Sequence, residues 1–200
     1  MKRIALLLSL LAVSAVPAFA QDNTTRIRGT IVSLEGNVLT VATAGENRRL
    51  TLTDGFHVIA VVKADITRIV PGIYVGSAAV TQPDGTLRAQ EVHIFPEAMR
   101  GTGEGHRPYD LGPQSTMTNG TVDTTALVES VGDHVLTLKY KDGEKKVFVS
   151  KDTPIVAYEA ADAKMLVPGA HVYIIAQRGP DGALSTARVN VGKNGLVPPM

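Results

Sequence analysis

Residues 70–85 read VPGIYVGSAAVTQPDG, and residues 167–182 read VPGAHVYIIAQRGPDG. Both stretches begin with Val-Pro-Gly and end with Pro-Asp-Gly, and positions 70 and 167 differ by 97. Val38-Leu39-Thr40-Val41 matches Val135-Leu136-Thr137-Leu138 at the same offset. Several independent matches at one spacing indicate an internal repeat, so the chain holds two copies of one module.

Each copy alternates apolar and polar residues in the way that is typical of short β-strands. Turn residues such as Gly36-Asn37 and Pro83-Asp84-Gly85 separate the runs. A short helical turn is predicted just before Pro71-Gly72, and the second copy repeats the plan from Thr125 to Val191. The strands predicted in the first copy span residues 27–34, 38–43, 48–53, 58–62, 73–81 and 87–95.

This order of elements predicts an all-β protein with two tandem small OB-like β-barrels, each with one short helical turn. An open β-sandwich is the alternative, but closing the sheet would remove the exposed edges that a lone meander leaves. The predicted modules cover residues 21–95 and 121–193. A long irregular strap, residues 96–120, joins them, and residues 194–200 are predicted to be a flexible tail.

The strap is rich in Gly and Pro, yet it differs from a flexible Gly/Ser tether because it carries large and charged side chains. We therefore expect it to be ordered and to lie on barrel surface. Long, chemically rich loops on a rigid scaffold are common binding sites. On this basis Arg100, Arg107 and Tyr109 are the predicted partner-binding residues.

Residues 1–20 are predicted to be a Sec-type signal peptide. Lys2 and Arg3 precede an apolar run, and Ala18-Phe19-Ala20 supplies the small residues that signal peptidase accepts. The expected location is the periplasm of a Gram-negative bacterium, with no transmembrane span after cleavage. Without the leader, 18 basic residues face 19 acidic ones, and this near-neutral charge argues against a nucleic-acid partner.

The repeated motifs resemble a bacterial family of exported OB-like domains of unknown function. In the first copy Gly29-Thr30-Ile31, Val38–Val41, Val70-Pro71-Gly72 and Asp84–Val92 carry the resemblance. The second copy matches from Val135 onward and lacks the opening glycine. The resemblance implies the fold and a tandem arrangement, and it implies no settled chemistry.

The sequence contains none of the common short motifs of serine hydrolases, zinc peptidases or phosphate-binding loops, and it has no cysteine. The protein is therefore expected not to be an enzyme and to need no cofactor. The predicted function is binding or scaffolding in the bacterial envelope, with an envelope protein, a peptide or a glycan as partner.

Two other functions remain open. A metal-handling protein associated with metal transport would use imidazole and carboxylate ligands, for which the candidates are His93, Glu97, Glu104, His106 and Asp110. A simpler interpretation is that His93 ends a strand and that His106 tethers the strap by hydrogen bonds. The second alternative is a hydrolase with a dispersed site. Tyr140, Tyr158 and Tyr173 either line a ligand surface or pack in the core.

Overall fold

The computed structural model describes residues 23–128 and 133–200, and the predicted signal peptide lies outside these described residues. The described chain is all-β, and its helices are four 3-10 turns of three residues each. Within this part of the chain, no helix has the length and apolar character that crossing a bilayer requires.

The order of elements follows the predicted repeat. The first copy contributes β1 Thr24–Glu35, β2 Val38–Ala42, β3 Asn47–Lys63, η1 Ile66–Arg68, β4 Tyr74–Thr81 and β5 Leu87–Ile94. The strap holds η2 Glu97–Met99 and β6 Gly105–Pro108. The second copy contributes β7 Ser115–Val128, β8 Asp133–Tyr140, β9 Gly143–Val149, β10 Ile155–Ala161, η3 Ala163–Met165, β11 His171–Arg178 and β12 Leu184–Gly192, followed by η4 Lys193–Gly195.

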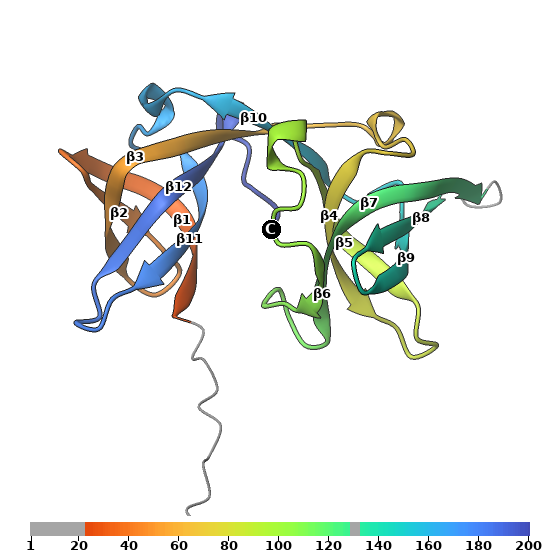
Figure 1. Ribbon diagram of the computed structural model, residues 1–200. Helices are drawn as coiled ribbons and strands as arrows, with labels where there is room; N and C mark the ends of the chain where they lie inside the picture. The colour runs from red at the N-terminus through yellow and green to blue at the C-terminus, as the bar shows by residue number, and fades with distance from the viewer. Residues whose placement is uncertain (1–22, 129–132) are drawn as a thin grey trace, which may run out of the picture.

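One strand differs from the prediction. Residues 48–53 and 58–62, which we expected to form two strands, belong to the single 17-residue strand β3. Gly55 lies in its middle with a φ of 69°, a conformation that glycine adopts without steric cost. The backbone therefore changes direction at Gly55 without ending the strand, and β3 becomes long enough to reach from one half of the molecule to the other (Figure 1).

Five strands close into a β-barrel, which we call the first ring. β1 pairs with β2 and β2 with β3, while on its other side β1 pairs with β11. β11 pairs with β12, and β12 closes the ring on β3 through the one parallel pairing of the five. In Figure 1 this lobe accordingly mixes the red and orange strands of the first copy with the blue strands of the second.

The second ring has the same plan with the copies interchanged. β7, β8 and β9 pair in order, β7 also pairs with β4, and β4 pairs with β5. β5 closes the ring on β9, again in parallel. Each ring thus contains three strands of one repeat and two strands of the other. We expected each copy to close on itself over residues 21–95 and 121–193, and the strand pairing differs from that expectation.

The physical reason for this exchange is the pairing of β3 with β10 across the middle of the molecule. The two strands run antiparallel, with Val61 opposite Tyr158. These two positions are also 97 residues apart, so each lies opposite its own counterpart in the repeat. The pairing is therefore centred on a pseudo-two-fold axis, and each strand carries its chain into the other ring before the turn at Pro-Gly.

The opening glycine, which seemed from the motifs to be missing in the second copy, is present as Gly120. β1 meets β2 with Ile31 opposite Val41, and β7 meets β8 with Val122 opposite Leu138. Ile31 and Val122 are 91 positions apart, because the hairpin that follows is six residues longer in the second copy. Gly29 and Gly120 are then counterparts, and at both a Cβ would clash with the backbone of the neighbouring strand.

The strap is shorter than predicted, because residues 115–120 belong to β7. What remains is ordered as expected: β6 pairs with β7, and Arg100 donates to the carbonyl oxygen of Gly72 at 2.9 Å. The predicted tail, residues 194–200, ends in a buried residue. Met200 is 1 % exposed, and its main-chain oxygen accepts a hydrogen bond from Arg28 at 2.8 Å. Apolar burial in the centre of the molecule holds this segment.

Three apolar clusters stabilise this arrangement. One fills each ring with the alternate inward residues of its five strands. The third lies at the junction and includes Val61, Tyr74, Phe95, Tyr158, Tyr173 and Met200. Aromatic side chains from both repeats thus gather at the pseudo-two-fold axis, next to the site described below.

Candidate functional site

A cavity of about 140 Å³ lies where the two rings meet. Side chains from β5 and β7 line it on one side, and side chains from β1, β11 and β12 line it on the other. The rest of the wall consists of Phe95, Tyr158 of β10, Met200 and the strap residues Thr102, Gly103, Arg107 and Tyr109. Since the lining comes from both rings and the strap, the cavity exists only in the assembled molecule.

His93 enters the cavity because Gly76 leaves room for it. Gly76 on β4 lies between His93 on β5 and Asn119 on β7. A Cβ at position 76 would clash with both His93 Nε2 and Asn119 Oδ1, so the two side chains converge over the glycine. The imidazole ring stacks on Tyr158 at a centroid distance of 5.1 Å, and Phe95 meets the imidazole edge-on at 4.8 Å. These contacts fix the orientation of the ring.

Glu91 supports His93 from behind. Its side chain is fully buried, and its Oε1 accepts a hydrogen bond from the Ala78 amide at 3.0 Å. His93 Nδ1 lies 3.1 Å from both carboxylate oxygens. Nδ1 therefore carries the proton that faces the carboxylate, and in the neutral ring Nε2 is left as a hydrogen-bond acceptor.

Two buried amides face the same cavity. Asn119 Nδ2 donates to the carbonyl oxygen of Thr102 at 3.0 Å, and Asn190 Nδ2 donates to that of Tyr173 at 2.9 Å. These bonds fix which end of each amide is the oxygen, because a flipped amide would set two acceptors against each other. Asn119 is 4 % exposed and Asn190 is 6 % exposed, and neither Oδ1 has a partner.

Arginines surround the cavity. Arg26, Arg107 and Arg188 contribute to the lining, and the Arg26 guanidinium lies over the Tyr109 ring at 4.9 Å. Arg26 Nε is buried without a hydrogen-bond partner, and Asp110 Oδ1 lies 3.9 Å from it. Across the described residues, the buried side-chain polar atoms that lack a partner are this Nε and the two asparagine oxygens, and all three belong to residues that line this cavity.

A neighbouring network orders the strap beside the site. Arg28 donates to both carboxylate oxygens of Asp110, at 2.9 and 2.7 Å, and this hydrogen bonding holds the pKa of Asp110 below its ordinary value. The Tyr109 hydroxyl lies 2.9 Å from the Tyr173 hydroxyl. Burial raises the pKa of Tyr109, so the phenol remains neutral and serves as a hydrogen-bonding group.

The residues predicted as metal ligands are not brought together. Glu97 pairs with Arg100, Asp110 pairs with Arg28, and Glu104 Oε1 accepts from the Lys141 amide at 3.0 Å. His93 bonds to Glu91, while His106 Nδ1 lies 2.8 Å from Thr118 Oγ1. In residues 23–128 and 133–200, no three His, Cys, Asp or Glu side chains are grouped as a metal site requires.

The predicted partner-binding residues divide between two roles. Arg107 and Tyr109 line the central cavity, and Arg107 Nη1 donates to the Gly103 carbonyl oxygen at 2.6 Å. Arg100 instead ties the strap to the turn before β4 and to Thr121 Oγ1. Of the tyrosines singled out in the sequence, Tyr158 and Tyr173 both pack in the core and line the cavity.

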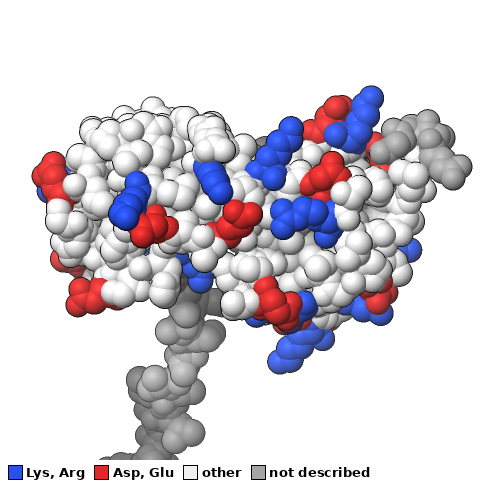
Figure 2. Space-filling view, turned by 90° about the horizontal axis from the view of Figure 1, so that it is seen from above, with Lys and Arg blue, Asp and Glu red and all other residues white. Residues whose placement is uncertain are grey.

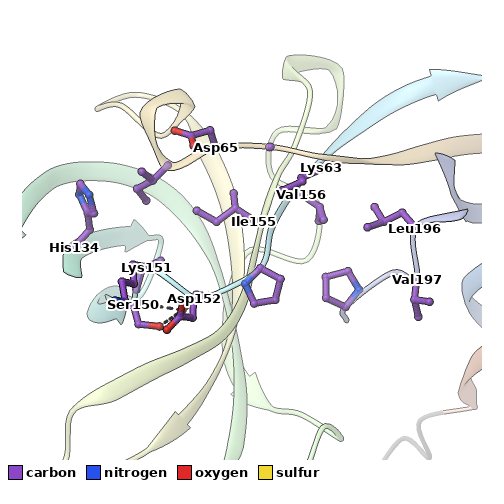
Figure 3. A pocket seen from close by; sticks show the side chains of 16 residues that line it. Lys63, Asp65, His134, Ser150, Lys151, Asp152, Ile155, Val156, Leu196 and Val197 are labelled. Atoms are coloured by element: carbon purple, nitrogen blue, oxygen red, sulfur yellow. Dashed lines mark hydrogen bonds between the residues drawn. The ribbon is translucent and has the colours of Figure 1, made fainter. Parts of the chain in front are cut away.

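A larger groove of about 650 Å³ lies between the second ring and the tail (Figure 3). Figure 3 shows His134, Ser150 and Lys151 on one side and Leu196 and Val197 on the other. The Ser150 hydroxyl lies 2.9 Å from the Thr153 hydroxyl and is therefore already paired. Although this groove is larger, the unpartnered buried groups lie in the central cavity, which we take as the candidate site.

Asn119, Asn190 and Glu91 are site residues that the sequence motifs did not point to. The available signal was the repeat itself. At the offset of 97, Glu91 corresponds to Arg188 and His93 corresponds to Asn190. Polar residues thus occupy both copies at these equivalent positions, and three of the four are buried, while Arg188 is exposed.

The surface seen in Figure 2 carries basic and acidic side chains intermingled over both lobes. No family model matches this chain, and no match was found among curated proteins or solved structures. The resemblance drawn from the motifs therefore stays a prediction, and any inference about function depends on the geometry of the site.

Proposed function

We propose that this chain is an exported binding protein of the bacterial envelope that holds a small molecule in the central cavity. The observation that carries the proposal is the placement of the unpartnered atoms. Buried polar groups are nearly always hydrogen-bonded. Three buried polar atoms of the described residues lack a hydrogen bond, and all three belong to residues that line one cavity, which favours a bound molecule that supplies the missing hydrogen bonds.

The topology of the rings supports the same proposal. In each ring three meandering strands are followed by two more that close on the third in parallel, and this order is typical of OB-like barrels. We infer two OB-like barrels that exchange their last two strands. Export to the periplasm is proposed from residues 1–20, in which a basic start, an apolar run and Ala18-Phe19-Ala20 follow one another.

The two other functions have less support. A metal-handling role would need His93, Glu97, Glu104, His106 and Asp110 to converge, and each is engaged elsewhere. A hydrolase could use His93 and Glu91 as an acid–base pair. However, the described residues that line the cavity include no serine, and their one threonine is Thr102.

The experiment is to purify the full chain from periplasm without unfolding it, measure its intact mass under native conditions, and then denature it to release and identify bound small molecules. We expect one molecule per chain. Asn119→Ala and Asn190→Ala should lose it, whereas Asn47→Ala, at the exposed start of β3, should keep it. As a second measurement, the melting temperature of the wild-type chain is recorded with and without the small molecules extracted from periplasm. If the chain releases no bound molecule and these small molecules leave its melting temperature unchanged, the proposal is wrong.

A further inference from the structure

The position of donors and acceptors around the cavity defines the chemistry of the molecule it fits. Resting on the function proposed above, we propose that the ligand is a small carboxylate whose other end carries N–H or O–H hydrogen-bond donors. An amino acid and a hydroxy acid share this chemistry. The inner end of the molecule would meet the asparagines, and its carboxylate would meet the arginines.

The inner part of the cavity offers acceptors. Asn119 Oδ1 and Asn190 Oδ1 have no donor, and their amide nitrogens are already bonded to backbone carbonyls. His93 presents Nε2, since Nδ1 is engaged by Glu91. A buried acceptor left unpaired destabilises the site, so a ligand that supplies donors here gains binding free energy that a ligand without donors does not.

Toward the surface, the polar groups that line the cavity are positively charged arginines. A depression of about 240 Å³ shares Ile175, Arg188 and Asn190 with the cavity, and we infer that it is the entrance. Arg188 is exposed there, and Arg107 lies half-buried on the strap side. Among the described residues neither guanidinium has a carboxylate within ion-pair distance, and the contact of Arg26 with Asp110 is long, at 3.9 Å.

The Arg188 guanidinium at the entrance has no carboxylate partner among the described residues, and it favours a carboxylate, which a guanidinium can bind through paired hydrogen bonds. Glu91 lies at the inner side, behind His93, and its carboxylate is already engaged by His93 Nδ1 and by the Ala78 amide. The site therefore has a direction, with donors of the ligand inward and its negative charge outward. The volume of about 140 Å³ limits the ligand to a small molecule.

The test uses the full chain, unfolded and refolded to remove bound molecules, in calorimetric titrations with four compounds of matched length. These are 4-aminobutyrate, 4-hydroxybutyrate, butyrate and n-butylamine, supplemented by two- and three-carbon analogues of each. We expect the amino or hydroxy carboxylates to bind about tenfold or more tightly than butyrate or butylamine, because each of the latter leaves one end of the site unpaired. The relative affinities of 4-aminobutyrate and 4-hydroxybutyrate then show whether the ligand is an amino acid or a hydroxy acid.

Two substitutions test which end of the ligand lies at the arginines and which end lies at the asparagines. Arg188→Gln should weaken binding of the carboxylates about tenfold and leave butylamine unchanged, while Arg49→Gln, an exposed arginine on β3, should change neither. Asn190→Ala should remove the advantage of 4-aminobutyrate or 4-hydroxybutyrate over butyrate. Because Arg188 is exposed, its substitution is expected to leave the melting temperature unchanged, which keeps the test independent of folding.

The outcomes separate this inference from the proposed function. Equal binding of butyrate and 4-aminobutyrate would overturn the assignment of donors. Unchanged carboxylate binding in Arg188→Gln would overturn the assignment of the carboxylate end. If a molecule is released from the purified protein but is a sugar, an amine or another compound without a carboxylate, the ligand class is wrong and the binding function stands. If no molecule is released and none of the compounds binds, both fail.

Discussion

Gly76 is the residue on which the shape of the central cavity depends most directly. We predict that Gly76→Ala lowers the free energy of unfolding by about 1–3 kcal/mol, because the new methyl group overlaps His93 and Asn119, which are both held by packing and hydrogen bonds. Chemical denaturation followed by circular dichroism measures the change. Ligand binding should be lost in the same variant, since both displaced side chains line the cavity.

Gly45→Ala is the matched control. Gly45 has open space around its Cα, with no neighbouring heavy atom within 4 Å of the position that a Cβ would take, and it should tolerate alanine without loss of stability. If Gly76→Ala is as stable as the control and still binds ligand, the two side chains above Gly76 are free to move, and the cavity is less well defined than the contacts indicate.

How far the sequence predicts the site can be judged residue by residue. His93, Arg107 and Tyr109 were candidates, and they do line the cavity, although they were assigned to separate metal and partner sites. Asn119 and Asn190 have no local motif, since a buried amide in a strand looks like any polar residue on an exposed face. Which face is buried depends on the partner strands, and the sequence does not identify them.

At the scale of elements, the turns are the most predictable feature. Gly72 and Gly169 follow proline in the repeated motif, and they have φ values of 91° and 88°. We predict that Gly72→Val and Gly169→Val each destabilise the protein by about 1–3 kcal/mol, because a β-branched residue is strained in this conformation. Thermal and chemical unfolding of both variants would measure the effect.

Gly45→Val is the control, because it adds the same side chain at a glycine that has no positive φ. Its effect on the free energy of unfolding is the reference for the other two variants. Similar losses in the two variants, each larger than that of the reference, are expected from the equivalent positions of the turns. A melting temperature equal to that of the reference in both would mean that these turns relax to accommodate valine.

Other elements show where local patterns stop being informative. The strands around Pro83-Asp84-Gly85 and Pro180-Asp181-Gly182 lie where the alternation predicts them. The prediction divided β3 into residues 48–53 and 58–62, yet pairing with β10 and β12 continues the strand through the residues between them. Gly120 was overlooked because a longer hairpin changes the offset from 97 to 91.

At the scale of the whole molecule, the exchange of strands could not be predicted. The two copies share their pattern of apolar residues and turns, so this pattern does not distinguish β4 and β5 from β11 and β12 as partners for the first ring. The choice is made by the length of β3 and its pairing with β10, which direct the chain into the other ring. This is a long-range interaction, and periodicity within one copy carries no information about it.

The exchange predicts how fragments behave. Residues 23–100 and 101–200, produced separately, should each lack a stable monomeric fold, because each ring needs strands from both. Mixed in equal amounts, they should form a one-to-one complex with the β content of the full chain. Circular dichroism and light scattering after size-exclusion chromatography would measure this. A stable monomer of residues 23–100 with native β content would show that a copy can close on itself.

The pairing of Val61 with its counterpart Tyr158 also bears on ancestry. A single repeat that assembled as a homodimer through these strands would place identical residues on both sides of its symmetry axis. Two glutamates at position 91, or two arginines at position 188, would then face a shared centre. Once duplicated and fused in one gene, the copies can mutate independently. The carboxylate and histidine on one side, with the guanidinium and amide on the other, make the centre asymmetric in a way that a homodimer of identical repeats cannot be.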